Sequence, residues 1–177
     1  LERWDNTGSV ILYAPTVKRV KQLARWLKGR GWDAGKYTGK MKSNKRQKAA
    51  ADFLSGKRSI LVATNAFGLG IDKPDVRLVI HAGLPLTLNG YVQEIGRAGR
   101  DGKKARCVLI YSRKDLSRNE RILKGCGNKK AVRRALKGLD ALKKMLDSNK
   151  CIWRVIEAYY GESPKGACGH CSRCASK

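Results

Sequence analysis

The pattern of apolar positions in this 177-residue chain differs before and after residue 112. Before it, short runs rich in Val, Ile and Leu alternate with segments of helical periodicity. The runs predict strands at residues 9–13, 59–63, 77–81 and 106–111. The periodic segments predict helices that include residues 20–27, 45–54 and 88–98. Strands that alternate with helices form a parallel sheet covered on both faces, so we expect an α/β fold.

After residue 112 no further strand-like run occurs. Residues 131–146 predict an amphipathic helix, residues 151–160 predict a shorter helix, and the chain ends in a glycine- and cysteine-rich segment. We therefore place a domain boundary in the basic, polar stretch 112–130. The prediction is a sheet domain at residues 1–112, followed by a linker and a small helical subdomain at residues 113–177.

The net charge of +25 is extreme, and it is spread over both predicted domains. Residues 1–112 contain 22 Lys and Arg against 8 Asp and Glu, and residues 113–177 contain 17 against 6. Solubility alone needs a much smaller charge. Nucleic acid is the partner that this charge favours, because Lys and Arg bind by neutralising phosphates.

No apolar run approaches the roughly 20 residues that a membrane-spanning helix needs, and no signal peptide is visible. The sequence therefore predicts an intracellular protein with no membrane partner. The chain contains six cysteines. In a reducing compartment, cysteines that cluster are more often metal ligands than disulfide partners.

Two arginines stand three positions apart in the stretch Gln93–Gly102, QEIGRAGRDG, and each follows a glycine. Arg97 and Arg100 could form salt bridges on a surface helix, or they could contact a triphosphate, since a guanidinium offers directional donors to phosphate oxygens. An earlier stretch, VATNAFGLGIDKP, begins where a predicted strand ends. It could be a purely structural turn, or a ligand site at the carboxyl end of a parallel strand.

These stretches resemble a known family. VATNAFGLGIDKPDVRLVIH and YVQEIGRAGRDG resemble motifs V and VI of superfamily-two helicases, and their wording is most similar to the RecQ family. SVILYAPTVKRVKQLARWL resembles motif IV, and CIWRVIEAYYGE with CGHCSRC resembles the zinc-binding subdomain of that family. The resemblance covers nearly the whole chain. It implies a second RecA-like lobe, with a parallel sheet between two helix layers, followed by a small helical zinc-binding subdomain.

The resemblance also implies roles for single residues in an ATP-dependent DNA helicase that moves 3′ to 5′. Gln93, Arg97 and Arg100 would contact ATP, with Arg100 as the arginine finger. Asp72 and Gly70 would lie against the nucleotide. The residues implied in contact with single-stranded or forked DNA are Tyr13, Thr16, Thr64 and Asn65.

The sequence contains no G-x-x-x-x-G-K-[ST] and no D-E-x-H, which belong to the first lobe of such helicases. ATP and Mg²⁺ would therefore bind only with a first RecA-like lobe, in cis or in trans, and this chain alone should be inactive. Two other functions stay open: a stand-alone DNA-binding or adaptor module that keeps the fold without the motor, and RNA unwinding. The helicase interpretation places the protein in the nucleus or nucleoid.

Four cysteines give the spacing C-x16-C-x2-C-x2-C, which suits a tetrahedral zinc and is also compatible with an iron–sulfur cluster. No Cys-Pro follows the last of them, and the resemblance implies one structural zinc. The expected ligands are Cys151, Cys168, Cys171 and Cys174. Outside this set, Cys107 is expected in the core, Cys126 in a loop, and His81 in a structural hydrogen bond.

Overall fold

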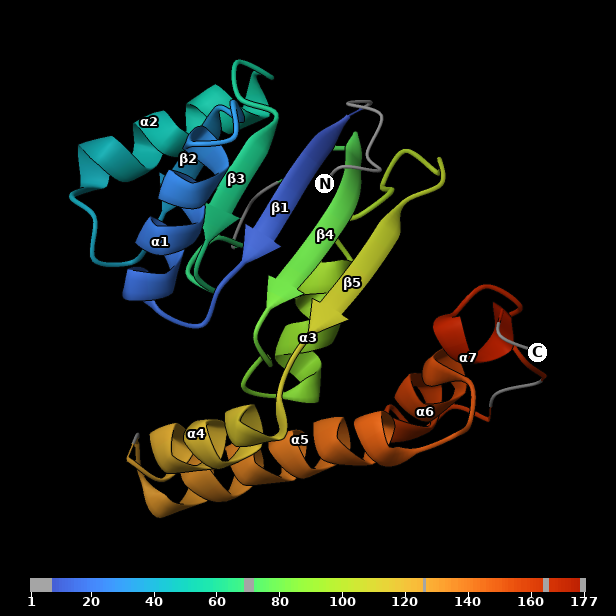
Figure 1. Ribbon diagram of the computed structural model, residues 1–177. Helices are drawn as coiled ribbons and strands as arrows, with labels where there is room; N and C mark the ends of the chain where they lie inside the picture. The colour runs from blue at the N-terminus through green and yellow to red at the C-terminus, as the bar shows by residue number, and fades with distance from the viewer. Residues whose placement is uncertain (1–7, 69–71, 126, 164–165, 176–177) are drawn as a thin grey trace. The chain divides into compact units, whose positions relative to one another are not determined.

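The computed structural model of the chain describes residues 8–68, 72–125, 127–163 and 166–175. Five parallel strands form one sheet with the order β2-β3-β1-β4-β5 (Figure 1). The strands are β1 Ser9–Tyr13, β2 Ala34–Tyr37, β3 Ile60–Ala63, β4 Val76–Ala82 and β5 Arg106–Ile110. The parallel α/β sheet predicted from the sequence is confirmed.

Helices cover both faces of the sheet, because the central strand carries apolar side chains on both. Val10 and Leu12 of β1 pack under helix α1, Val17–Lys28. Ile11 lies on the opposite face, in a cluster that includes Phe53 of helix α2, Ser43–Leu54. The third helix of this part, α3, is Leu88–Ile95. Successive side chains of a strand point to opposite faces, so one run of buried residues serves two helix layers.

The sequence did not predict β2. Its four residues, AGKY, include a glycine and no aliphatic β-branched residue, so they carry no strand signal. The strand nevertheless pairs with β3 along its whole length. A Cβ atom at Gly35 would lie 3.0 Å from Leu61 Cδ1, so the glycine also lets the neighbouring strand's side chain pack closely. Pairing and packing override the weak local propensity.

The chain divides into two compact units, residues 1–85 with 90–115, and residues 86–89 with 116–177. The helices that lie mainly in the second unit are α4 Arg113–Lys124, α5 Lys129–Asp147, α6 Ile152–Tyr159 and α7 Ser172–Ala175. The apolar side of α5 buries Leu139, Leu142 and Met145. Gly138 lies against Thr87, where a Cβ atom would come within 3.0 Å of the threonine Cβ.

Helix α4 lies in the stretch where the sequence analysis placed a linker, and this expectation is corrected. The helix is polar overall, and only Leu116, Ile122 and Leu123 are large and apolar. Leu123 and the polar Asn119 are its buried residues. Such a helix gives too narrow an apolar stripe to be recognised from the sequence. Within the described residues, no helix is long and apolar enough to cross a membrane.

Cys107 is exposed, which contradicts the prediction that it lies in the core. Its strand, β5, was predicted correctly, but it is an edge strand that pairs only with β4. An edge strand of a parallel sheet is covered less completely than the central strands, which is why Val10 and Ile11 of β1 are fully buried and Cys107 is not. The apolar run alone did not reveal which strand would lie at the edge.

Candidate functional site

A shallow groove lies beyond the carboxyl ends of β1 and β3. Thr16 is the N-cap of α1, and its side chain accepts a hydrogen bond of 3.1 Å from the Arg19 backbone N–H. Thr64 and Asn65 follow β3 directly, and they line the groove together with Thr16. The structure therefore brings together three of the four residues expected to contact DNA. The groove has a volume of about 540 Å³.

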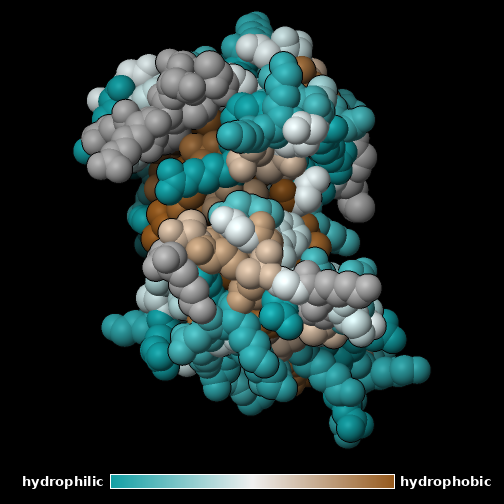
Figure 2. All heavy atoms as spheres, turned by 90° about the vertical axis from the view of Figure 1, so that its right-hand side faces the viewer, coloured by the Kyte–Doolittle hydropathy of each residue, from teal (hydrophilic) through white to brown (hydrophobic). Residues whose placement is uncertain are grey.

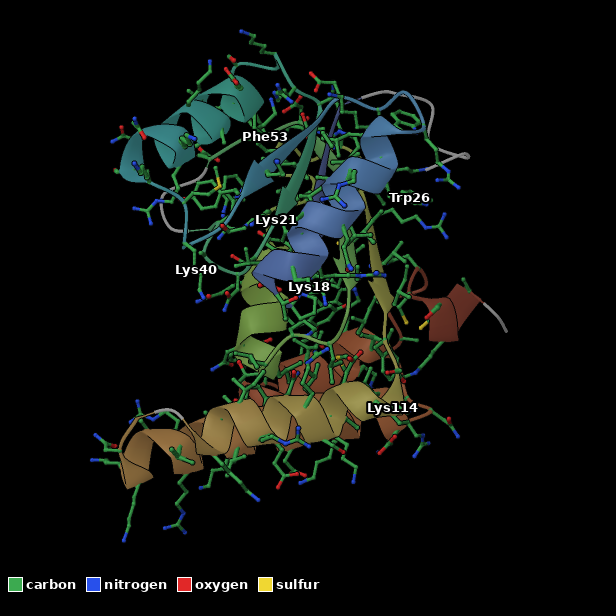
Figure 3. All side chains as sticks on the ribbon, turned by 60° about the vertical axis from the view of Figure 1, so that its left-hand side comes forward. Lys18, Lys21, Trp26, Lys40, Phe53 and Lys114 are labelled. Atoms are coloured by element: carbon green, nitrogen blue, oxygen red, sulfur yellow. The ribbon has the colours of Figure 1, made fainter. Side chains whose placement is uncertain are left out.

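Two lysines that the sequence analysis did not single out also line this groove, Lys18 from the first turn of α1 and Lys40 from the loop after β2. Figure 3 labels both at the same end of the sheet. Lys18 is the second residue of α1, and Lys40 follows Gly39 in the loop after β2. Nothing in the local sequence marks either lysine, and only the fold shows that the two segments meet at one edge of the sheet. Two cations beside a helix N-terminus favour a phosphate-bearing ligand.

Tyr13, the fourth residue of that set, is 3% exposed and does not line the groove. Its hydroxyl donates to the Phe67 carbonyl oxygen at 3.2 Å, and its ring stacks on His81 with centroids 5.3 Å apart. Burial raises the pKa of Tyr13, and the Arg97 guanidinium, which hydrogen-bonds the hydroxyl, opposes that shift. Tyr13 stands at the end of β1 with its side chain in the core, so the side chain is not accessible to DNA in the groove.

His81 forms the structural hydrogen bond that the sequence predicted. Its Nε2 lies 2.7 Å from Glu94 Oε2 of α3, and the histidine is 1% exposed. The rings of Tyr13 and Tyr91 flank it. This buried cluster joins β1, β4 and α3, and its Glu94 stands three residues before Arg97.

Arg97 is half-buried and lies against the glycine-rich turn after β3. A Cβ atom at Gly68 would lie 2.6 Å from Arg97 Nη2, so any larger residue there would displace the guanidinium. The same guanidinium hydrogen-bonds Tyr13. The two stretches singled out in the sequence therefore touch through Arg97, and the absence of a side chain at Gly68 leaves room for the guanidinium.

Arg100 is exposed, in contrast to Arg97. Its Nη1 donates to Asp72 Oδ1 at 2.9 Å, with the side chains 39% and 82% exposed, and its Nε donates to the Gly96 carbonyl oxygen at 3.3 Å. Gln93 is also exposed, one turn before Arg97. These side chains are accessible to a ligand. Gly70, expected beside the nucleotide, lies outside the described residues.

Arg77, at the start of β4, holds the loop that follows the arginine pair. It donates to the carbonyl oxygens of Pro74, Lys103 and Lys104, and it forms an ion pair with Asp101. This role of Arg77 was not predicted, because nothing local marks an arginine in a strand as a partner of a loop more than 20 residues away. Arg77 connects the ends of both glycine-rich stretches, and so supports the positions of Asp72 and Arg100.

The second unit contains the four cysteines in one cluster. Cys151 precedes α6, and Cys168, Cys171 and Cys174 come from the C-terminal loop and α7. Their sulfur atoms all lie within 4.8 Å of one another. The separations are 3.9 Å for Cys151–Cys171 and Cys168–Cys174, and 3.4 Å for Cys171–Cys174. A tetrahedron of Zn–S bonds needs sulfur atoms about 3.8 Å apart, so the residues present fit such an ion.

Backbone amides point at these sulfur atoms. The Cys168 N–H donates to Cys151 Sγ at 3.4 Å, and the Cys171 N–H donates to Cys168 Sγ at 3.3 Å. Burial acts to raise the pKa of Cys151, but amide donors, chiefly that of Arg154, outweigh it and lower the pKa to about 6. The pKa of Cys171 is lowered in the same way, against burial. Metal ligation requires thiolates, and this environment favours them at Cys151 and Cys171, whereas the hydrogen bond with the Cys171 sulfur raises the pKa of Cys174 to about 11.

Arg173, between two of the cysteines, anchors the cluster to α5. Its guanidinium donates to the carbonyl oxygens of Met145 at 2.6 Å, Leu146 at 3.0 Å and Lys150 at 3.1 Å. These acceptors include the last carbonyl groups of a helix, which have no partner within the helix itself. Apart from the basic residue inside the cysteine loop, no feature of the sequence indicates this role.

Two family models match the chain. The first, described as the helicase conserved C-terminal domain, matches residues 2–102. The second, described as RecQ zinc-binding, matches residues 113–175. The first therefore contains the groove and the arginine pair, and the second contains the cysteine cluster.

Similar proteins include several helicases. A protein of Acanthamoeba polyphaga mimivirus that is named as an ATP-dependent RNA helicase is 37% identical over 166 residues, 94% of this chain and 30% of that protein. The ATP-dependent DNA helicase RecQ of Bacillus subtilis is 35% identical over 164 residues, 93% of this chain and 28% of that protein. The ATP-dependent DNA helicase Q5 of Rattus norvegicus is 35% identical over 180 residues, 97% of this chain and 18% of that protein. The chain spans less than a third of these curated relatives.

Solved structures agree on the fold of the first unit. The Escherichia coli DEAD-box protein SrmB matches with a TM-score of 0.58 and 29% identity, over 68% of this chain and 72% of that chain. The C-terminal domain of the DEAD-box protein Dbp5 matches with a TM-score of 0.54 and 26% identity, over 75% of this chain and 83% of that chain. The RecA-like fold expected from the sequence is therefore confirmed.

Proposed function

This chain belongs to the RecQ family of superfamily-two helicases, as the C-terminal region of such a protein, and we propose that it forms part of an ATP-dependent DNA motor. Its first domain, residues 1–112, would complete the ATP site and hold a single strand of DNA. Its second domain, residues 113–177, would hold a structural zinc ion. The observation that carries the proposal is the contact of Arg97 with Gly68. This contact joins the stretch 93–102, which contains the arginine pair, to the stretch 62–74, whose first residues line the groove.

The nucleotide would bind between this chain and a first RecA-like lobe, supplied in cis or in trans. The exposed Arg100 guanidinium would leave Asp72 and reach the γ-phosphate, where charge develops during phosphoryl transfer. Asp72 would then be released to contact the ribose, Gly70 would lie nearby, and Gln93 would contact the triphosphate. Mg²⁺ would be held by the first lobe and the ATP phosphates.

The single strand would lie in the groove lined by Thr16, Thr64 and Asn65. Lys18 and Lys40 would neutralise its phosphates, and the N-terminus of α1 would add backbone donors. Movement along that strand would run 3′ to 5′, as in the family, and the substrate would be chromosomal DNA in the nucleus or nucleoid. Arg97 would couple the two sites, because its guanidinium packs on the turn whose first residues line the groove.

A polypeptide of residues 1–177 is expected to lack ATP turnover at a helicase-like rate. It contains no phosphate-binding G-x-x-x-x-G-K-[ST] loop and no D-E-x-H acid, so nothing holds the β- and γ-phosphates or activates the water. Steady-state hydrolysis with saturating single-stranded DNA measures this. Adding a first lobe, fused or as a separate chain, should restore turnover. Turnover by residues 1–177 alone that matched an intact helicase would contradict the proposed division of the active site.

The same polypeptide should bind single-stranded DNA with little sequence preference and with strong salt dependence. The log–log slope of affinity against salt should change by about 0.7 for each phosphate contact. Lys18→Gln and Lys40→Gln should each reduce the slope by about that amount, and Lys57→Gln, an exposed lysine outside the groove, should leave it unchanged. Fluorescence anisotropy with a labelled oligonucleotide measures this. Affinity that is independent of salt, or tighter binding to the matching RNA strand, would exclude this DNA site.

A further inference from the structure

Five cations project from one side of helix α5, in the second unit. They are Lys129, Lys130, Arg133, Arg134 and Lys137, and all five are exposed. At 100° per residue they fall within a sector of about 140°, centred opposite the buried Leu139 and Leu142. No Asp or Glu occurs between Lys129 and Leu139. Figure 3 shows long nitrogen-tipped side chains projecting from the α4–α5 pair into open space.

This arrangement is unfavourable for the helix alone. Lys129 with Arg133, Arg133 with Lys137, and Lys130 with Arg134 are like-charge pairs at i and i+4, which destabilise a helix. The first turn contains Lys129 and Lys130 and no acidic residue, so the cations also oppose the helix dipole.

The carboxylate nearest to the five cations in sequence, Asp140, pairs with Lys144 at 2.9 Å. Among the residues that the structure describes, none of the five cations forms an ion pair, whereas Lys124 pairs with Glu120 and Lys144 pairs with Asp140 elsewhere in the same unit. The cationic face is therefore not part of a salt-bridged surface. It presents an unbalanced positive charge at a cost to the helix, which an anionic partner would relieve.

We propose that this cationic face of α5 binds the sugar–phosphate backbone of duplex DNA, as a contact separate from the single-strand groove. The five charges span eight residue steps, about 12 Å, so their mean spacing along the helix axis is about 3.0 Å. Duplex DNA presents one phosphate per about 1.7 Å of axis, and one strand presents one per about 3.4 Å. The cations are therefore denser than the phosphates of a single strand, and a duplex is the nucleic acid that can neutralise all five.

The surface beside the cations also suits a sugar–phosphate backbone. Lys129, Arg133 and Lys137 border a shallow hollow of about 510 Å³, and its lining also includes Val132, Leu136 and Asp140, the partner of Lys144. A nucleic acid backbone alternates anionic phosphates with apolar faces of deoxyribose, and this hollow offers apolar contact within reach of the cations. The inference takes its substrate class from the proposed function, but its residues lie outside the groove and the arginine pair.

The test compares two triple variants that lose the same charge. The first replaces Lys129, Arg133 and Lys137 with Gln, and the control replaces Lys114, Lys143 and Lys150, which are exposed and lie outside the five. Binding to a short blunt duplex and to oligothymidylate of equal length is measured over a range of salt concentrations. For the first variant, the duplex log–log slope should fall by about 0.9 for each lost contact, about 2.7 in total, with the single-strand slope nearly unchanged. The control should retain the wild-type duplex slope.

Thermal unfolding provides the second measurement. Because the first variant removes two like-charge pairs, α5 should unfold at the same or a higher temperature while duplex affinity falls. A lower unfolding temperature would assign the cations a structural role and overturn the inference. Equal loss of duplex binding in both triple variants would show that net charge, and not the α5 face, determines the affinity, and would overturn the inference. Unchanged duplex binding together with lost binding to an acidic protein would show that the face binds such a protein and not DNA. If Lys18→Gln and Lys40→Gln fail to weaken single-strand binding while the α5 variant still weakens duplex binding, the proposed groove fails and the duplex face stands.

Discussion

Replacing Arg100 with alanine is expected to reduce ATP turnover by about 10³–10⁵-fold in a protein that joins residues 1–177 to a first motor lobe, with DNA affinity retained. Arginine fingers contribute this much in related phosphoryl-transfer enzymes, because a fixed guanidinium stabilises charge that exists only in the transition state. Arg100 is the exposed member of the pair, and its Asp72 partner is 82% exposed, so the guanidinium is available to a nucleotide. Steady-state ATPase assays, with single-stranded DNA binding by anisotropy, measure the two effects separately.

Arg100→Ala should have little effect on the stability of the folded protein. An exposed ion pair such as Arg100–Asp72 contributes less than about 1 kcal/mol to stability, so the unfolding temperature of Arg100→Ala should stay close to that of the wild type. Arg30→Ala is the matched control, since Arg30 is exposed and stacks on Trp26 at 4.0 Å, away from both glycine-rich stretches. Full ATPase activity in Arg100→Ala, or an equal loss in Arg30→Ala, would exclude the arginine-finger assignment.

The residues around the arginine pair do not by themselves separate Arg97 from Arg100, and only the family resemblance favours Arg100 as the arginine finger. Both follow a glycine and stand three positions apart, and nothing local distinguishes them. The distinction depends on Gly68 and Tyr13, which approach Arg97 and leave Arg100 exposed. Tyr13 itself was misassigned for the same reason. A tyrosine at a strand end can point into the groove or into the core, and only the pairing of its strand in the middle of the sheet decides.

The helices and strands likewise differ in whether the local sequence or distant partners in the fold determine them. The four strands with continuous Val, Ile and Leu runs were predictable, because such runs are typical of parallel strands, although the run does not show which strand lies at the edge. Strand β2 and helix α4 were missed, since AGKY and RKDLSRNERILK carry too few apolar side chains and depend on partners distant in sequence. The cysteine cluster was predictable from spacing alone, because its ligands need only one metal to bring them together.

Loss of the metal is expected to unfold the C-terminal segment while the sheet domain stays folded. Among the described residues between Gly161 and Ala175, Cys171 is the only buried one, so hydrophobic burial cannot offset the ~1–2 kcal/mol of backbone entropy per ordered residue. A structural zinc contributes roughly 10–16 kcal/mol of apparent free energy in small zinc peptides, comparable with the ~5–15 kcal/mol total stability of a domain. The hydrogen bonds of Arg173 to the end of α5 would be lost together with the metal.

Cys171→Ser should therefore release the zinc ion and expose residues after Lys150 to protease, while residues 9–112 remain resistant. Cys107→Ser is the matched control, because that thiol is exposed on β5 and lies outside the cluster. Elemental analysis should find one zinc ion per chain and no iron in the wild type and the control, and chelation of the wild type should reproduce the proteolysis pattern of Cys171→Ser. A brown protein that contains iron would replace the zinc ion by an iron–sulfur cluster. A C-terminal segment that resists protease after complete chelation would show that the Arg173 contacts and α6 are sufficient to hold it, and the metal would then have no structural role.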